Sequence, residues 1–302
     1  MTNQQRIDNL SVPQGRIDVV LDTDTFNEVD DQFAIAYMLR SDEKLDVKAI
    51  YAAPFLNQKV SSPAEGMEKS YEEIKKILKL AKADVPVFKG STTYLPDEKT
   101  PVISDVAKDL AQRANNYSPK KPLYVVSIGA ITNIASAILL NPKVAENTVV
   151  VWLGGHALHY HNTLEFNMMQ DIAAARVVIK SGVPFVQLPC WGVVSSFTLS
   201  EPEIHAWLSG KNELSDYLTG IALAEMAKIE NTIVRSRVIW DVTAVAWLLN
   251  DGNRFMLSRI IKAPLPTYDN LYQDDPDGYD MRYIYFIDRD CLLNDLIRKL
   301  SK

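Results

Sequence analysis

The chain has 302 residues, of which 47% are hydrophobic and 23% are charged, and its formal net charge at pH 7 is -6. This composition is typical of a globular protein, and an acidic chain without a basic block argues against a nucleic-acid partner. No apolar run is long enough to span a membrane. The two cysteines, Cys190 and Cys291, provide no disulfide framework, and we expect a cytoplasmic protein.

Residues 1–15 are polar and lack the apolar segment of a secretory signal, so we expect a flexible N-terminal arm. After it, strand and helix patterns alternate. The predicted strands are 17–21, 47–53, 85–88, 123–129, 148–153 and 184–188, the last of the sheet, and the predicted helices are one from residue 30 or 31, then 64–81, 103–115, 132–140 and 171–180. This alternation predicts an α/β fold with a mostly parallel sheet, open and Rossmann-like, and helices on both faces.

The remainder of the chain is less regular. Residues 201–250 have a mainly helical pattern, turn-forming residues follow from Pro264 to Gly278, and a strand at 282–286 precedes a helix at 290–300. The acidic segment Tyr268 to Tyr279 has no pattern that indicates a role. Because no glycine- or proline-rich linker divides the chain, we expect a single domain over residues 1–302.

An acidic stretch follows the first predicted strand. Asp22 and Asp24 end that strand, and Asp30 and Asp31 begin the next helix. Acidic residues in a first helical turn are favoured by the helix dipole, which accounts for Asp30 or Asp31 without any function. It does not explain Asp22 and Asp24. Like charges crowded in a partly buried site either have raised pKa values or recruit a cation. Carboxylate oxygens without nearby His or Cys favour Ca²⁺ or Mg²⁺ over zinc.

Two enzyme classes fit this stretch. Asp22-Thr23-Asp24-Thr25 matches the DxDxT signature of haloacid-dehalogenase-type phosphatases, in which the first Asp is a nucleophile and Mg²⁺ is the cofactor. That signature leaves Asp30 and Asp31 unexplained. It also requires a later Lys and a later acidic pair at strand ends, for which the chain has no convincing candidates.

A longer series of motifs resembles the inosine–uridine-preferring nucleoside hydrolase family. The opening run is similar to the family's DxDxxxDD, although the turn here is two residues longer. Further segments occur in the family's order: Asn57 after the second strand, Val85 to Gly90, Ser127 to Ala135 (similar to GxLTNxA), Gly154-Gly155 followed by Glu165-Phe166-Asn167, and Asp241. The similarity covers residues from about 17 to 250.

The resemblance implies a Ca²⁺ ion bound by Asp24, Asp31, Asp241 and the backbone carbonyl of Ile128. Asp24 would also orient and deprotonate the water that attacks C1′ of a ribonucleoside. The positions that resemble ribose-binding residues are Asn27, Asp30, Asn57, Asn162, Glu165 and Asn167. In isolation, an Asn such as Asn57 or Asn162 in a loop is more often a turn former than a ligand. Three of the four histidines lie in the loop after Gly155, where we expect solvent exposure.

The residue before Asp241 departs from many family members. Pyrimidine or mixed-specificity members have a His there that protonates the leaving base, whereas this chain has Trp240. A Trp side chain cannot donate that proton, but its face can stack on a purine and stabilise a base that solvent protonates at N7, which resembles the purine-specific branch. Packing in the core is the alternative role. Phe55, Tyr71 and Trp191 are candidates for a second stacking aromatic.

We therefore expect a Ca²⁺-dependent nucleoside hydrolase of purine salvage, with a small-molecule nucleoside as its substrate. The resemblance also implies a homodimer or homotetramer. Two alternatives stay open at this point: a Mg²⁺-dependent phosphatase, and a non-catalytic member that binds ribosides through the metal.

Overall fold

The computed structural model describes residues 1–302, and its centre is one sheet of eight strands. These are β1 (Ile17–Thr23), β2 (Leu45–Ala52), β3 (Val87–Lys89), β4 (Leu123–Ser127), β5 (Thr148–Leu153), β6 (Phe185–Leu188), β9 (Met256–Lys262) and β12 (Asp280–Ile287). Their order is β3-β2-β1-β4-β5-β6-β12-β9. Only β9 is antiparallel to its neighbour. Two small antiparallel pairs lie outside the sheet: β7 (Thr198–Ser200) with β8 (Ser236–Val238), and β10 (Leu265–Pro266) with β11 (Tyr272–Gln273).

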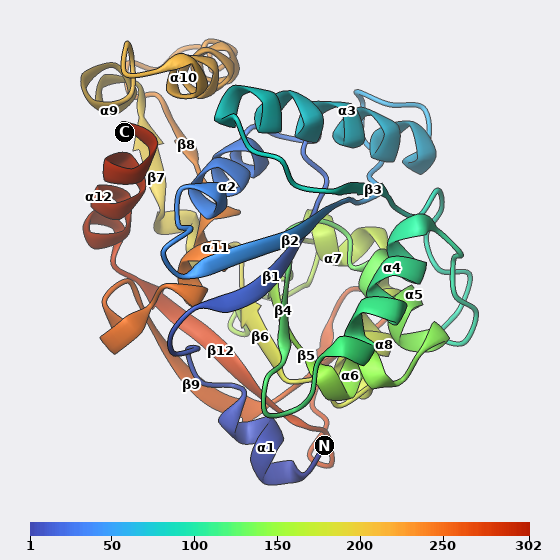
Figure 1. The fold of residues 1–302 in the computed structure, drawn as a ribbon. Helices are drawn as coiled ribbons and strands as arrows, with labels where there is room; N and C mark the ends of the chain where they lie inside the picture. Colours follow the sequence, from blue (N-terminus) through green and yellow to red (C-terminus); the bar gives the residue numbers. More distant parts are fainter.

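Helices cover both faces of the sheet (Figure 1). They are α1 (Asn3–Asp8), α2 (Asp30–Leu39), α3 (Pro63–Ala81), α4 (Asp105–Arg113), α5 (Thr132–Leu140), α6 (Lys143–Asn147), α7 (Phe166–Gln170), α8 (Ile172–Lys180), α9 (Glu201–Trp207), α10 (Glu213–Met226), α11 (Val242–Leu248) and α12 (Arg289–Leu300). Three short 3₁₀ helices lie at Ala114–Asn116, Val194–Ser196 and Asp251–Asn253. Residues of α2, α3, α10, α11 and α12 pack in one core cluster, and residues of α4, α5 and α8 pack in the other.

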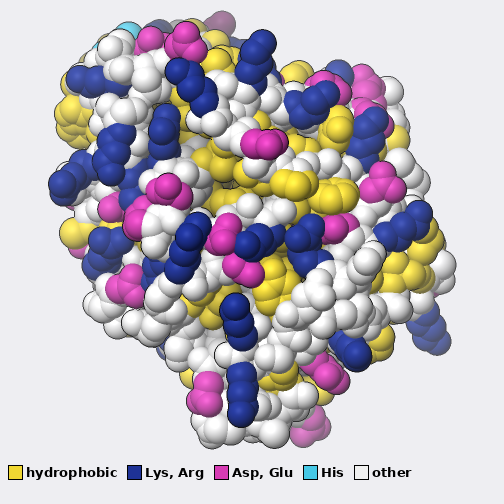
Figure 2. Space-filling view, in the orientation of Figure 1, with side chains coloured by type: hydrophobic (Ala, Val, Ile, Leu, Met, Phe, Trp, Pro, Cys, Tyr) yellow, Lys and Arg dark blue, Asp and Glu magenta, His cyan; other side chains and the backbone are white.

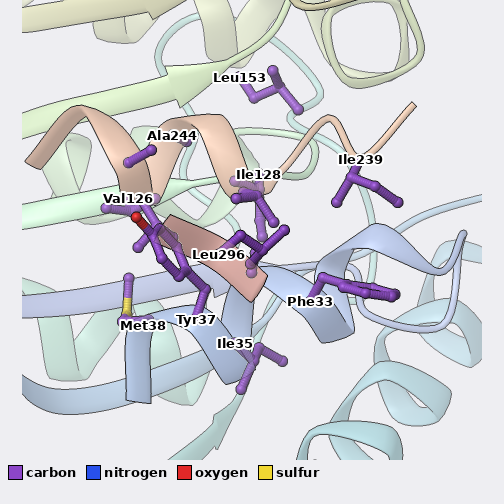
Figure 3. Packing of buried hydrophobic residues seen from close by; sticks show 14 of the residues in the cluster. Phe33, Ile35, Tyr37, Met38, Val126, Ile128, Leu153, Ile239, Ala244 and Leu296 are labelled. Atoms are coloured by element: carbon purple, nitrogen blue, oxygen red, sulfur yellow. The ribbon is translucent and has the colours of Figure 1, made fainter. Parts of the chain in front are cut away.

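The apolar sequence of β1 explains its central position. Val19 and Leu21 pack in one core cluster, and Val20, between them, packs in the other. A strand that is buried on both faces requires this unbroken apolar run. Figure 3 shows residues of the first cluster, among them Phe33 and Tyr37 of α2 and Val126 of β4.

The strand order reverses between β1 and β4. The chain moves outward from β1 through β2 to β3, then returns to β4 on the other side of β1 and continues to β5 and β6. In open α/β sheets the ligand crevice forms at such a reversal, outside the carboxyl ends of the strands. Backbone bonds continue past these ends, since the Ile128 amide donates to the Asp22 carbonyl and the Ala53 amide donates to the Thr23 carbonyl, both at 2.8 Å. The acidic stretch is therefore held firmly at the crevice.

The fold class and all six predicted strands of the parallel sheet are confirmed, but one expectation about the second half of the chain is wrong. The strand at Phe185–Leu188 does not end the sheet, because β12 pairs with β6 and β9 pairs with β12. The region 201–250 is mainly helical, as predicted, and contains one short strand, β8, between its helices. The mixed polar and apolar residues of Met256–Lys262 suit a half-exposed edge strand, a weaker signal than the apolar runs of the central strands.

The first fifteen residues are packed rather than free, unlike the flexible arm that the sequence suggests. Helix α1 starts with a capping box between Thr2 and Gln5. Leu10, just beyond the helix, is completely buried, and the side chain of Asn9 donates to the Pro119 carbonyl at 2.9 Å. A capped helix of six residues is too short to produce a helical periodicity that a sequence pattern would show.

The face in Figure 2 carries basic and acidic side chains interspersed with apolar ones. None of the helices combines the length and the hydropathy that a bilayer crossing requires.

Gly90, directly after β3, should tolerate no side chain. An added Cβ would lie 2.0 Å from the carbonyl oxygen of Ala52, a backbone atom that cannot move aside. We expect Gly90→Ala to lower the free energy of unfolding by roughly 1–3 kcal/mol, the usual cost of overpacking. Gly220→Ala in α10 is the matched control, because its Cβ meets nothing within 4 Å. Urea denaturation of both variants checks this, and equal stabilities would contradict it.

Candidate active site

A cavity of about 650 Å³ opens at the carboxyl ends of β1, β4 and β5. Its predicted lining residues come from elements far apart in the sequence: Asp24, Asn27, Asp30, Asp31, Asn57, Ile128, Glu165, Asn167, Trp240 and Asp241. Thus the sheet gathers every residue of the predicted site except Asn162 around one cavity.

Four aspartates form the floor of the cavity. Asp24 follows β1, Asp30 and Asp31 form the first turn of α2, and Asp241 directly precedes α11. All four are buried, with at most 4% of each residue exposed. The amide of Asp241 donates to the Asp30 carboxylate at 3.3 Å, and the Thr23 hydroxyl donates to the Asp31 carboxylate at 2.5 Å. These contacts fix the two helix ends against the end of β1.

Crowding strongly disfavours the charged form of these carboxylates. Burial, followed by the charge of Asp31, raises the pKa of Asp24 well above its ordinary value. Burial and the charges of Asp30 and Asp31 do the same to the pKa of Asp241. Burial also raises the pKa of Asp31 to about 7, although hydrogen bonds from Thr23 and Asp241 oppose this shift. A bound cation would favour the charged form of these carboxylates, because their attraction to the cation would outweigh the repulsion among them.

The donor set fits a hard divalent cation. Carboxylate oxygens of Asp30, Asp31 and Asp241 lie within 4.8 Å of one another, without a His or Cys among them. Oδ2 of Asp24 is buried and has no hydrogen-bond partner. An orphaned carboxylate oxygen beside an all-oxygen cluster is what an oxygen-ligated ion such as Ca²⁺ or Mg²⁺ would satisfy. This group of three includes Asp30, which the sequence analysis assigns to ribose binding. It does not include Asp24, which the sequence analysis assigns to the ion.

The amide side chains form the walls around this floor. The Asn57 side chain donates to Asn27 Oδ1 at 2.8 Å, which brings the turn after β1 and the segment after β2 together. The side chain of Asn167 donates to the carbonyl of Ile128 at 3.2 Å and to that of Leu153 at 3.0 Å. A carbonyl oxygen has two lone pairs, so Ile128 retains one acceptor position. The opening turn is two residues longer than in the family's motif, and it still places Asn27 at the cavity.

Glu165 is held by backbone amides at the start of α7. Its carboxylate accepts from the amides of Gly155 at 2.7 Å, Asn167 at 2.9 Å and Met168 at 2.9 Å. It is thus a helix cap as well as a lining residue, and it ties the loop after β5 to α7. Burial raises its pKa, and these three amide donors counteract the shift.

Two expectations about the loop after β5 are wrong. Asn162 is not among the lining residues: its side chain accepts from the Leu164 amide at 3.1 Å, the turn-forming role of a loop Asn. His156, expected in a solvated loop, is 6% exposed and lines the cavity. The loop is folded inward by distant contacts, such as the bond from the Thr163 amide to the Asn270 carbonyl at 2.8 Å.

Two tryptophans stand together in the cavity wall. The rings of Trp191 and Trp240 are 5.6 Å apart and inclined at 63°. Trp191 is 51% exposed, which is a large apolar area for a cavity residue. The other two candidate aromatics do not line the cavity: Phe55 is buried in the core, and Tyr71 packs against the core and the ammonium groups of two lysines. Trp191 is therefore the second aromatic beside Trp240.

The cavity also includes charged residues that sequence reasoning missed. Arg237 of β8 pairs with Glu28 in the opening turn, and Lys59 donates to the Asn27 carbonyl at 2.7 Å. Arg237 and Lys59 belong to segments without a motif, so only the folded structure brings them to the site.

Comparison with known proteins decides between the interpretations. A family model described as inosine-uridine preferring nucleoside hydrolase matches residues 19–274. The chain belongs to this family. It is therefore a nucleoside hydrolase, an N-glycosidase, and the expectation based on the five ordered motifs is confirmed. The matched residues include Asp30 and Asp31, which the phosphatase interpretation leaves unexplained, and they extend past Asp241.

Individual nucleoside hydrolases are distant relatives. The non-specific ribonucleoside hydrolase RihC of Salmonella agona is 26% identical over 256 residues, which cover 76% of this chain and 78% of that one. Among solved structures, a purine-preferring ribonucleoside hydrolase from Gardnerella vaginalis has a TM-score of 0.77 at 19% identity, covering 94% of this chain and 98% of the other. A plant nucleoside hydrolase has a TM-score of 0.74 at 19% identity, covering 96% and 99%. The structural matches establish the α/β fold.

Proposed function

We propose that this nucleoside hydrolase uses a bound Ca²⁺ ion and prefers purine ribonucleosides. The observation that supports this most directly is the combination of four buried aspartates with a tryptophan pair in a single cavity. The aspartates provide an oxygen-only site for the ion and a base for water. The tryptophans provide an aromatic surface that suits a flat, two-ring base.

Asp24, Asp31, Asp241 and the Ile128 carbonyl are the groups that would hold the ion, with Asp30 beside them. When bound, the ion would position the ribose hydroxyls and lower the pKa of a water molecule. A carboxylate has two oxygens, so Asp24 can contact the ion through one and accept the proton of that water through the other, and its Oδ2 has no partner within the protein. The water oxygen then bonds to C1′ as the bond to the base breaks through an oxocarbenium-like transition state.

The remaining polar residues would orient the ribose. Asp30 presents a carboxylate, an acceptor for a sugar hydroxyl, and its position is fixed by the amide of Asp241. Asn27 and Asn57, joined by their own hydrogen bond, form one wall, and Asn167 forms another. Side chains already held by such bonds need little reordering when substrate binds, so they orient it at low entropic cost.

Removing the indole at position 240 should affect purines more than pyrimidines. Stacking of a base on an aromatic ring contributes about 1–3 kcal/mol, so we expect Trp240→Ala to lower kcat/KM for inosine by roughly 5- to 150-fold. The loss for uridine should be smaller because one ring overlaps less. Trp240→Phe should recover part of the inosine activity. Equal losses for both nucleosides would contradict a stacking role.

Release of free ribose from inosine, adenosine, uridine and cytidine tests the proposed preference. Faster release from both purine nucleosides would support the role of the tryptophan pair. Release from uridine as fast as from inosine would refute purine preference but not hydrolysis. Binding of nucleosides without any release of ribose would indicate a non-catalytic family member.

A further inference from the structure

The departing purine base requires a proton, and the residue before Asp241 cannot supply it. Trp240 has an indole N–H that does not act as an acid at neutral pH. Eleven titratable residues line the cavity: seven are carboxylates, four of them in the floor, and the others are Lys59, Arg237, Cys190 and His156. Of the four histidines in the chain, His156 alone lines the cavity. An imidazole is the side chain best suited to deliver a proton near pH 7.

His156 lies on the same wall as the tryptophan pair. The amide of Ala157 donates to the carbonyl of Trp191 at 2.9 Å, so the backbone beside His156 is bonded to the backbone of Trp191. Trp191 in turn contacts Trp240. A base stacked on the tryptophan pair would therefore occupy the cavity that His156 also lines.

The backbone of His156 is fixed from several directions. The Tyr272 hydroxyl donates to the His156 carbonyl at 3.1 Å. The Gln187 side chain donates to that hydroxyl at 3.0 Å, and the Gly155 amide donates to the Glu165 carboxylate. An imidazole on such a support has little freedom to move away from a bound substrate. These contacts also assign a role to part of the acidic tail segment, since Tyr272 lies within it.

The side chain of His156 has an unsatisfied polar atom. Its Nδ1 is buried and has no hydrogen-bond partner, although the residue is 6% exposed. A buried ring nitrogen that serves only a structural purpose is normally hydrogen-bonded. The ring also packs against Tyr160, with centroids 5.3 Å apart. Burial lowers the pKa of His156, although the Leu164 backbone opposes this shift, and a lower pKa makes the imidazolium a stronger acid.

We propose that His156 is the proton donor for the leaving base in this hydrolase. The inference rests on the proposed function. The imidazolium gives its proton to N7 of the purine while the C1′–N9 bond breaks and its electron pair stays on the base. The water oxygen bonds to C1′, and its proton passes to Asp24. Asp24 then returns a proton to solvent and His156 takes one up, so the reaction consumes one water and yields ribose and neutral base.

A pair of substrates with different leaving groups tests this role. Inosine needs a proton on its base, whereas p-nitrophenyl riboside expels a stabilised phenolate without one. We expect His156→Gln to lower kcat/KM for inosine by about 10²- to 10⁴-fold, the usual contribution of a general acid, and to leave p-nitrophenyl riboside hydrolysis unchanged. His161→Gln is the matched control: it lies in the same loop, is exposed and does not line the cavity, so it should alter neither rate.

The two substrates separate this inference from misfolding and from failure of the proposed function. Equal losses of His156→Gln on both substrates would indicate a structural role and overturn the inference, as would an unchanged rate on inosine. A wild-type protein that hydrolyses neither riboside would overturn the proposed function and, with it, the role of His156. If His156→Gln loses activity on inosine but retains activity on the nitrophenyl riboside, the result supports His156 as the proton donor.

Discussion

Replacing Asp24 with asparagine is expected to reduce hydrolysis of inosine by about 10²- to 10⁴-fold or more, the contribution of a general base. The carboxamide has the same shape but cannot accept the proton of the attacking water, and it removes one negative charge from the groups that would hold the ion. Because the residue is buried and Oδ2 has no partner in the protein, the exchange breaks no intramolecular hydrogen bond at that atom. The variant should therefore fold, and initial rates of ribose release should reveal a loss of kcat rather than a loss of protein.

Asp18→Asn is the matched control for this substitution. Asp18 lies in the same strand, β1, but near its amino end, where its carboxylate accepts from Tyr117 at 3.0 Å. We expect full activity from the control. Wild-type activity in Asp24→Asn would show that another group activates the water, and the assignment of Asp24 would then be wrong.

The second large effect is expected at Asp241, where stability and activity should change in opposite directions. Burial and neighbouring carboxylates disfavour the charged form of Asp241, so in the absence of a cation this residue destabilises the fold. Asp241→Asn should raise the Tm of the cation-free protein, by roughly 2–4 °C for each kcal/mol of repulsion that it removes. The same change should nearly abolish hydrolysis, because it removes a ligand of the ion.

Thermal melts with added Ca²⁺ complete this test. A ligand that binds only the folded protein raises Tm in proportion to the logarithm of its concentration. The wild-type protein should be stabilised by Ca²⁺ strongly and Asp241→Asn weakly, so their order of stability should reverse. A variant that gains as much stability from Ca²⁺ as the wild type would place the ion elsewhere.

The acidic floor was predictable from sequence because each of its residues follows a recognisable element. Asp24 ends an apolar strand, Asp31 begins a helix, and parallel strands bring their carboxyl ends to the same side of the sheet. Family motifs then indicated Asp241, more than two hundred residues away. In each case a strong local pattern and a rule of topology sufficed.

The walls of the cavity were less predictable because loop conformation depends on distant contacts. Asn162 and His156 lie in the same loop, yet Asn162 forms a local turn and His156 lines the cavity. Their positions depend on Asn270 and Tyr272, which belong to a tail segment without any periodic pattern. Trp191 could not be ranked above Phe55 for the same reason, since burial rather than residue type separates them.

Ribose release from inosine in the presence of Ca²⁺, and again after chelation, tests the central claim most directly. The four-aspartate floor predicts rapid release with Ca²⁺, loss of release with a chelator, and recovery when Ca²⁺ is returned in excess. Release that continues unchanged in the chelator would contradict a catalytic role for the ion. In that case the buried carboxylates would have to act without a cation.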